Sequence, residues 1–190
     1  ESIYINYSIN FKKIGWSRIQ IEKIFHYFNP DFTEFDLDIN GISFYHNFKI
    51  NGGSFGLKVA HKNAKNSTFG NGLNSAILDR SFSQIDVKFS YKQKLKNFLD
   101  SFSFGFSNSF REYLSEVSFD SLHLGREHMH YSFFISIIKE LRNDISIELK
   151  YNTIYRDTKS DYDWVQLIKT FNNNQINLKF SYKTDLDLFY

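Results

Sequence analysis

Apolar and polar residues alternate one by one along most of the chain, with Ser, Asn, Lys, Asp or Glu between the apolar positions. The clearest apolar sets are Ile3, Ile5, Tyr7, Ile9 and Phe11; Phe55, Leu57 and Val59; Ile85, Val87, Phe89 and Tyr91; Phe102, Phe104 and Phe106; Tyr131, Phe133, Ile135 and Ile137; Ile145, Ile147, Leu149 and Tyr151; and Ile176, Leu178, Phe180 and Tyr182. Because successive side chains of a strand point to opposite faces, this period predicts β-strands with one apolar and one polar face.

Turn motifs separate several of these runs. Asn51-Gly52-Gly53 predicts a tight hairpin, because Asn and Gly accept the positive φ of primed turns. At Asn40-Gly41 the parity of the apolar positions changes, which predicts a hairpin or a bulge. Further short turns are predicted at residues 29–31, 96–97 and 142–144, and longer loops at 62–79 and 156–161. Short turns at one end of the strands and long loops at the other are typical of outer-membrane barrels.

Residues 17–28 follow a different pattern. The apolar residues at helical spacing are Ile21, Ile24, Phe25 and Phe28. Ser17 and Gln20 stand at the spacing of a capping box, as in a short amphipathic helix near 17–28. A strand that contains Ile19 and Ile21 is equally well supported.

Composition narrows the class of protein. Aromatic residues make up 19% of the 190 residues, yet 23% are charged and the net charge is only +2. No run approaches the ~18 consecutive apolar residues of a membrane helix, so a helical membrane protein is excluded. The charged residues form no basic stripe, so the sequence gives no indication of nucleic-acid binding. Without cysteine there are no disulfides or thiolate metal sites. We expect one domain over residues 1–190, either a processed protein or the C-terminal part of a longer one.

Alternation alone does not show which face meets an apolar environment. Several runs reach the ~9–11 residues that cross a bilayer, and a small barrel is too narrow to hold so many aromatic rings. We therefore expect an all-β, antiparallel, up-and-down transmembrane β-barrel of about ten strands (roughly eight to twelve), with its apolar face toward lipid. The polar residues predicted to face the lumen are Lys88, Lys92, Glu148, Lys150, Lys179, Lys183, Asp185 and Asp187.

The last run ends on an aromatic residue, through Leu178, Phe180, Tyr182, Leu186, Leu188 and Tyr190. It resembles the C-terminal assembly signal of outer-membrane proteins, although Thr184 interrupts the apolar set and Tyr stands where Phe is commoner. The resemblance implies a location in the cell outer membrane. It also implies contact with lipid and lipopolysaccharide, and recognition by the barrel-assembly machinery.

Residues 110–190 carry a second resemblance. Its motifs are Arg111-Glu112-Tyr113, Asp120, Arg126-Glu127, Tyr131, Tyr151, Arg156-Asp157 and Ser160-Asp161-Tyr162. In this order they are similar to the C-terminal barrels of outer-membrane proteins that carry periplasmic tetratricopeptide repeats and export polysaccharide or surface lipoproteins. No helical repeat is present, so the resemblance implies only the barrel architecture.

His61 is the one catalytic candidate. Its surroundings resemble outer-membrane phospholipase A, in which a lipid-facing His is followed two residues later by Ser, with an Asn in the next strand. His61 has the parity of the apolar face, but Asn63 stands at the nucleophile position and Ser83 or Gln84 at that of the Asn. A His without an adjacent hydroxyl cannot form an acyl-enzyme by base assistance, so we expect an interfacial histidine.

Three further histidines lie close together in the sequence. His128 and His130 share a strand face with each other, while Glu127 points to the opposite face and His123 precedes the strand. Because no third ligand is fixed nearby, we expect a rim location and neither a metal nor another cofactor.

These observations favour a non-enzymatic, integral outer-membrane barrel that acts as a structural, assembly or export-pore component of an envelope complex. Its partners would be other envelope proteins. Polar side chains would largely fill the lumen. One alternative is a phospholipase-like lipid hydrolase that uses His61, and another is a soluble β-barrel that binds an apolar ligand.

Overall fold

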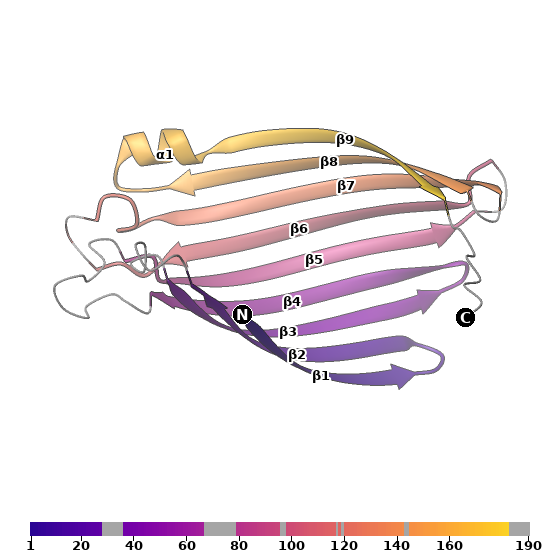
Figure 1. Cartoon of the computed structure of the whole chain (residues 1–190), viewed down its shortest axis with the longest axis horizontal. Coiled ribbons are helices and arrows are strands. Elements are labelled where there is room, and N and C mark those ends of the chain that lie inside the picture. Colours follow the sequence, from indigo (N-terminus) through magenta and orange to yellow (C-terminus); the bar gives the residue numbers. More distant parts are fainter. Residues whose placement is uncertain are drawn as a thin grey trace, which may run out of the picture.

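The protein forms one curved antiparallel sheet in which the strands follow chain order (Figure 1). A computed structural model describes residues 1–27, 36–66, 79–95, 98–116, 118, 120–142 and 145–182. The strands are β1 (Ser2–Phe11), β2 (Gly15–His26), β3 (Leu37–Ile50), β4 (Gly53–Asn66), β5 (Phe82–Lys94), β6 (Ser101–Tyr113), β7 (Glu127–Arg142), β8 (Ile145–Lys159) and β9 (Phe171–Tyr182). A short helix, α1 (Asp163–Lys169), joins β8 to β9. The expected all-β, up-and-down class is confirmed, with nine strands in the described residues.

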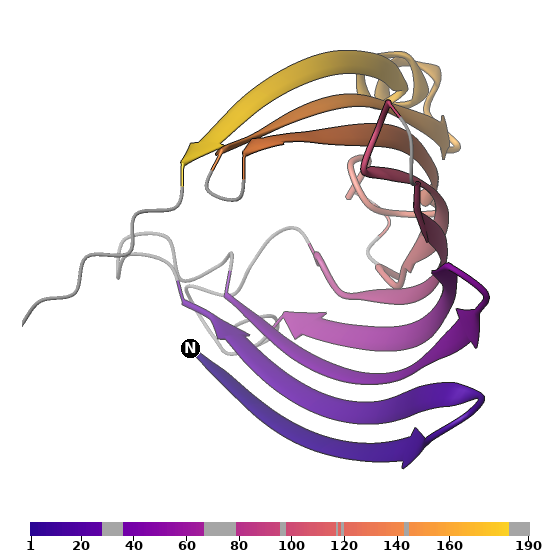
Figure 2. The same cartoon turned by 90° about the vertical axis from the view of Figure 1, so that its right-hand side faces the viewer.

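The sheet is curved but open. Seen from its end it has the outline of a letter C, with β1 and β9 at the two free edges (Figure 2). Each strand pairs only with its chain neighbours, so β1 and β9 do not pair with each other in the described residues. Because nine is an odd number of alternating strands, β1 and β9 run in the same direction.

The strands are long and regular. They have 10 to 16 residues, against the ~5–6 of an average strand. The pairing of β7 with β8 shifts register between Glu140 and Arg142, beside the end of β7. The predicted hairpin at residues 51–53 is confirmed, since β3 ends at Ile50, β4 begins at Gly53, and Gly52 has a φ of +74°.

Two local patterns differ from the structure for a common reason. Residues 17–26 belong to β2, so the strand interpretation is confirmed and the helix interpretation is wrong. Asn40-Gly41 lies inside the unbroken β3, so the hairpin or bulge predicted there is wrong. At this end of the sheet the polar face carries a small apolar cluster of Ile24, Leu37, Ile39, Ala64, Phe82 and Tyr113. The strands are therefore apolar on both faces here. That produces the helix-like spacing in β2 and the change of parity in β3.

The predicted loops also begin later than expected. β4 continues to Asn66 and β8 to Lys159, so the loops predicted at 62–79 and 156–161 are wrong in their first residues. Residues 67–78, and the predicted turns at 29–31, 96–97 and 143–144, lie outside the described residues. Within the described chain, no helix has the length and apolar character to span a membrane.

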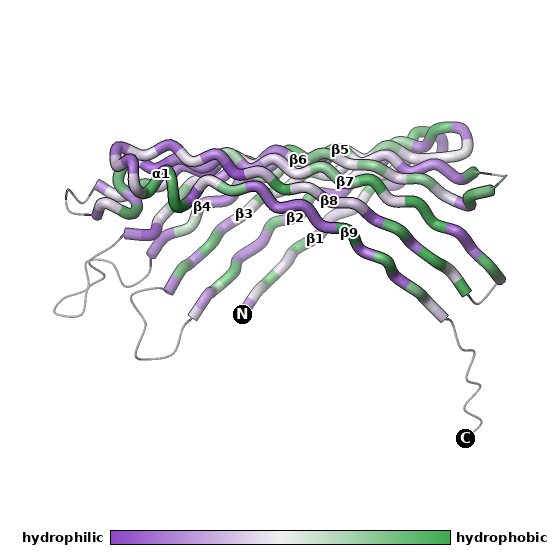
Figure 3. The backbone as a smooth tube through the Cα atoms, turned by 90° about the horizontal axis from the view of Figure 1, so that it is seen from above, coloured by the Kyte–Doolittle hydropathy of each residue, from purple (hydrophilic) through white to green (hydrophobic). Residues whose placement is uncertain are grey.

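The two faces of the sheet differ in both polarity and crowding. Apolar and polar residues alternate along each strand (Figure 3). The apolar face is the more exposed: Ile5 is 66% exposed and Ile42 52%, whereas His128 and Ser136 on the polar face are each 3% exposed. Side chains converge on the concave side of a curved sheet and diverge on its convex side. The polar face is therefore the concave one, and the apolar face is convex.

Glycines inside the strands relieve the crowding of the concave face. A Cβ on Gly41 would lie 2.7 Å from the Glu22 side chain, and one on Gly105 would lie 2.3 Å from the Phe134 ring. The absence of a side chain at Gly41 lets Glu22 of β2 reach Lys62 of β4 across β3, at 2.7 Å. The concave face is thus a densely packed polar layer.

Candidate functional site

The convex face is an apolar band that crosses every strand. Its exposed members include Ile5, Ile21, Ile42, Phe44, Val59, Ile85, Phe89, Phe106, Tyr131, Phe133, Leu149, Tyr151, Leu178 and Phe180. Along β8 the band runs from Ile145 to Tyr155, about ten steps of ~3.3 Å, or ~33 Å. With the ~40° tilt usual in membrane barrels this corresponds to a height of ~25 Å, the thickness of their apolar belt.

A polar row borders this band at one end. The register places Lys23, Asn40, Asn63, Ser83, Glu112, Glu127 and Lys159 side by side from β2 to β8. They have the same parity as the apolar band and lie next to its last apolar row. A change from apolar to charged side chains along one line across the sheet is typical of a boundary between lipid and water.

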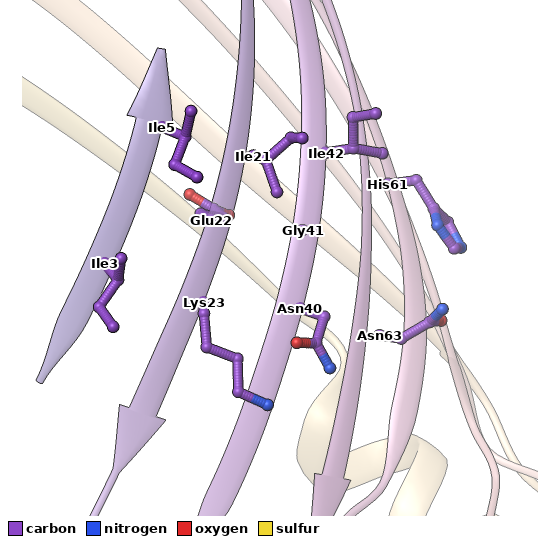
Figure 4. A pocket seen from close by; sticks show the side chains of 10 residues that line it. All are labelled: Ile3, Ile5, Ile21, Glu22, Lys23, Asn40, Gly41, Ile42, His61 and Asn63. Carbon is purple, nitrogen blue, oxygen red and sulfur yellow. The ribbon is translucent and has the colours of Figure 1, made fainter.

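His61 lies at this boundary. It stands in one row between Ile42 and Ile85, and lines a shallow depression together with Asn63 (Figure 4). Its Nε2 is 3.2 Å from the Oγ of Ser83 on the neighbouring strand. The expectation that His61 lacks an adjacent hydroxyl is therefore wrong. The partner comes from β5, since Ser83 lies two residues before Ile85, the register partner of His61.

The sequence-predicted polar residues share the concave face where they are described. The register puts Lys88, Lys92, Glu148, Lys150 and Lys179 on this face. Glu148 lies directly opposite Lys179, and its Oε1 accepts a hydrogen bond of 2.6 Å from Ser136 Oγ. Lys183, Asp185 and Asp187 lie outside the described residues.

The terminal run is likewise described only in part. Leu178, Phe180 and Tyr182 belong to the convex face of β9 and are 59%, 67% and 67% exposed. Leu186, Leu188 and Tyr190 lie outside the described residues, so the resemblance to an assembly signal stays an expectation.

A basic and aromatic cluster occupies the concave face at the end of β6, the start of β7 and the end of β8. Register places Arg111 opposite His128 and His128 opposite Thr158, with His130 opposite Arg156 in the next row. Tyr113 extends the cluster at the end of β6, where its N–H donates to the carbonyl of Arg126 at 3.0 Å. We call Arg111, Tyr113, Arg126, His128, His130, Arg156 and Thr158 the concave cluster.

Aromatic rings and hydrogen bonds hold its guanidinium groups in place. Arg126 Cζ lies 3.9 Å from the centre of the Tyr113 ring. Arg111 donates from Nε to Gln84 Oε1 at 2.7 Å. Arg156 donates from Nε to the carbonyl of Lys169, at the end of α1, at 2.8 Å. Such contacts fix the orientation of guanidinium groups that would otherwise be flexible.

Asp120 anchors the connection between β6 and β7 beneath this cluster. Its side chain is fully buried and accepts hydrogen bonds from Ser115 Oγ, from the N–H of Asp79 and from the N–H of His123. His123 Nδ1 also lies 3.0 Å from Asp120 Oδ1. Burial nevertheless lowers the pKa of His123, and Arg126 and Arg80 lower it further, against the raising effect of Asp120.

The three clustered histidines do not form a metal centre in the described residues, where no group of three or more potential ligands is found. The His128 and His130 rings lie 5.7 Å apart, and His123 packs against Tyr113. The close spacing of these histidines in the sequence identifies them as candidate ligands. Arg111 lies in β6, Arg126 immediately before β7 and Arg156 in β8, so only the register reveals that they converge. Comparison with protein-family models, curated proteins and solved structures gave no match.

Proposed function

We propose that the chain is an integral outer-membrane β-barrel protein that acts, without enzymatic activity, as a structural, assembly or export-pore component of an envelope complex. The observation that carries this proposal is the exposure of the convex apolar face. In the described residues the buried hydrophobic side chains are few, namely Ile39, Ala60, Ala64, Phe82 and Val165. A soluble protein would leave the rest of its apolar surface in water. A membrane protein covers it with lipid.

Neighbouring phenylalanines on β7 give a direct test. Phe133 belongs to the convex apolar face and Phe134 to the concave one, where its ring lies against Gly105. In a background with both tryptophans, Trp16 and Trp164, replaced by Phe, the variants Phe133→Trp and Phe134→Trp would each carry one fluorophore. Lipids brominated on the acyl chains should quench the first and spare the second. Equal quenching of the two, or quenching of neither, would contradict the assignment of the faces.

Closure of the barrel requires the edges at β1 and β9 to find partners, since unpaired backbone groups are not tolerated in lipid. Direct pairing of two strands that run in the same direction would be parallel, unlike every other pair in the sheet. We therefore propose that one further antiparallel strand lies between them, which gives the even number usual in bacterial barrels.

Introduced cysteines test this arrangement in a chain that has none. Cys at Tyr7 would be combined with Cys at Asn174, Ile176 or Leu178. With a strand between the edges, the thiols lie ~10 Å apart. A dithiol linker of that length should then join them, while oxidation should form no disulfide, which needs Cα atoms within ~7 Å. Efficient disulfide formation in any of the three pairs would show direct pairing instead.

The crowding of the concave face suggests how readily the barrel would conduct ions. Long side chains cross between its strands: Glu22 pairs with Lys62, and Glu148 accepts a hydrogen bond from Ser136. We propose a lumen that is largely filled, which favours a structural or partner-binding role over free diffusion. Small or absent steady currents in planar bilayers are expected, and large open-channel currents would contradict a filled lumen.

The contact between His61 and Ser83 favours a second candidate, a lipid acyl hydrolase. Ser83 Oγ would attack an ester carbonyl while His61 accepts its proton and passes it to the departing alcohol. Water would then release the acyl group from Ser83. Both residues lie at the boundary of the convex face, where ester groups of lipids would meet them. Phosphatidylcholine hydrolysis that is unchanged in His61→Ala and Ser83→Ala, compared with a Ser90→Ala control, would eliminate this candidate.

A further inference from the structure

Among the residues that the structure describes, the concave cluster has buried polar atoms with no hydrogen-bond partner. These are Arg126 Nε, both ring nitrogens of His128, and Thr158 Oγ1. The three residues are 5%, 3% and 0% exposed. A buried donor or acceptor left unpaired is destabilising, so several in one place need an explanation. A bound ligand that accepts hydrogen bonds would pair with Arg126 Nε, with Thr158 Oγ1 and with the one ring nitrogen that carries a proton in neutral His128.

These atoms lie within one small patch. His128 and Thr158 are register partners. Arg126 lies immediately before β7, and its guanidinium stacks on the ring of Tyr113, which also packs against His128. Two residue steps along a strand are ~7 Å, and three adjacent strands span ~10 Å. An area of that size fits a ligand of a few heavy atoms, which side chains of β6, β7 and β8 would contact.

The charge of the patch indicates the charge that its ligand should carry. The positive charges of Arg126, Arg156 and Arg111 all act on His128. The acidic groups that face the cluster are engaged elsewhere: Asp120 accepts from four donors around the β6–β7 connection, and Asp86 accepts from Gln84. Three guanidinium groups with little compensating charge favour an anion.

We propose that the concave cluster binds a phosphate group, either free phosphate or a phosphate monoester. Arg126 Nε and the guanidinium of Arg156 would donate to its oxygens, together with His128 and Thr158 Oγ1. A carboxylate has two oxygens and one charge. A phosphate dianion has enough oxygens and charge for three guanidinium groups and a hydroxyl at once. Arg111 donates from Nε to Gln84 and from Nη1 to Tyr113 Oη at 3.5 Å, so its second Nη would be the donor to the ligand, and the Nε contact of Arg156 leaves its Nη groups for the same role.

Thr158→Val is the sharpest variant. The valine has nearly the same shape, and the hydroxyl it removes has no partner among the described residues. Without phosphate, the unfolding midpoint should stay the same or rise, because an unsatisfied buried group is lost. Phosphate affinity should fall about fivefold, as expected for one hydrogen bond of ~1 kcal/mol. A lower midpoint without phosphate, or an unchanged affinity, would overturn the role of Thr158.

Arg126→Gln tests the charge. The full chain in a neutral detergent would be titrated with inorganic phosphate at constant ionic strength, with heat of binding and unfolding midpoint as readouts. The variant should bind phosphate at least about tenfold more weakly, in line with a charge-assisted hydrogen bond. Arg18→Gln is the matched control, because Arg18 lies on the concave face of β2, away from the cluster. Phosphate binding by the parent that is absent, or equal in Arg126→Gln, would overturn the proposal.

A second arm separates the two sources of a phosphate group. Vesicles of phosphatidylcholine that contain phosphatidic acid, whose head group is a phosphate monoester, would be compared with vesicles of phosphatidylcholine alone, each with and without inorganic phosphate. A stabilisation by inorganic phosphate in neutral detergent, lost in Arg126→Gln, supports a soluble ligand. Stabilisation by phosphatidic acid alone, again lost in Arg126→Gln, supports a lipid head group in the same site. Lipid effects that persist in Arg126→Gln would count against the site.

Discussion

Arginine placed at Phe133 should destabilise the protein far more than arginine placed at its neighbour Ser132. Phe133 is the third of five alternating apolar positions on β7, near the middle of the band, and is 38% exposed. For a side chain of ~200 Å² that is ~75 Å², worth ~2 kcal/mol when lipid covers it. A cation at the bilayer midplane adds ~2–4 kcal/mol, so Phe133→Arg should cost ~4–6 kcal/mol.

Ser132 lies on the concave face, where its Oγ is 2.7 Å from Ser107 Oγ. Ser132→Arg loses that hydrogen bond of ~1 kcal/mol but keeps its charge on the polar side. The assay is equilibrium unfolding by guanidinium of the full chain folded into vesicles, followed by tryptophan fluorescence. Equal costs for the two variants, or a cost below ~1 kcal/mol for Phe133→Arg, would refute the claim that the convex face meets lipid.

Three further measurements probe the ends of the strands. The hydrogen bond from the backbone N–H of Glu140 lowers the pKa of Asp100. The ionised carboxylate therefore stabilises the fold above its unfolded pKa of ~3.9, and this contribution is lost as the pH falls through the folded pKa. Asp100→Asn should therefore lose less stability than the parent between pH 5 and pH 2. Burial lowers the pKa of His123, so stability should fall as the pH drops below ~6.5, and His123→Asn should abolish that part of the loss between pH 7.5 and 5.5. Trp164 on α1 is 46% exposed, and lipids brominated near the head groups should quench its fluorescence. The same lipids should not quench Trp16, which lies on the concave face. Quenching of Trp16 and not of Trp164 would place α1 away from the membrane surface.

The alternation of the sequence predicted the strands because one physical rule governs the whole convex face. The convex side of every strand carries apolar side chains, so the pattern repeats from Ile5 in β1 to Leu178 in β9 with little interruption; if that face meets lipid, as proposed, any apolar side chain suits it. The Asn51-Gly52-Gly53 hairpin was predictable for a similar reason, since it needs only residues that accept a positive φ.

The failures lie where both faces are apolar. Ile24 and Ile39 turn toward the small cluster around Phe82, while Ile21 and Ile42 stay on the convex face. In a single strand this gives apolar residues three positions apart, which a periodicity rule interprets as a helix or a break. Only the pairing of β2, β3 and β4 distinguishes these cases, and pairing is a property of the whole sheet.

The concave cluster could not be predicted from the sequence, for a different reason. Arg111, Arg126 and Arg156 were each visible within motifs of the last 80 residues, but as an order along the chain. Their convergence depends on the register of β6, β7 and β8, in which a shift by one residue would turn every side chain to the other face. The contact between His61 and Ser83 has the same origin in the register of β4 and β5.

This difference between the faces indicates where the specific function resides. A convex face that meets lipid, as proposed, needs only apolar side chains, and many sequences would supply them equally well. The concave face has specific demands: glycine at position 41 makes room for the ion pair between Glu22 and Lys62, and Asp120 is buried with its donors matched. Within that satisfied layer, the unpartnered atoms of Arg126 and Thr158 are exceptions. Exceptions of this kind are expected where a protein binds something, because a site is completed by its ligand.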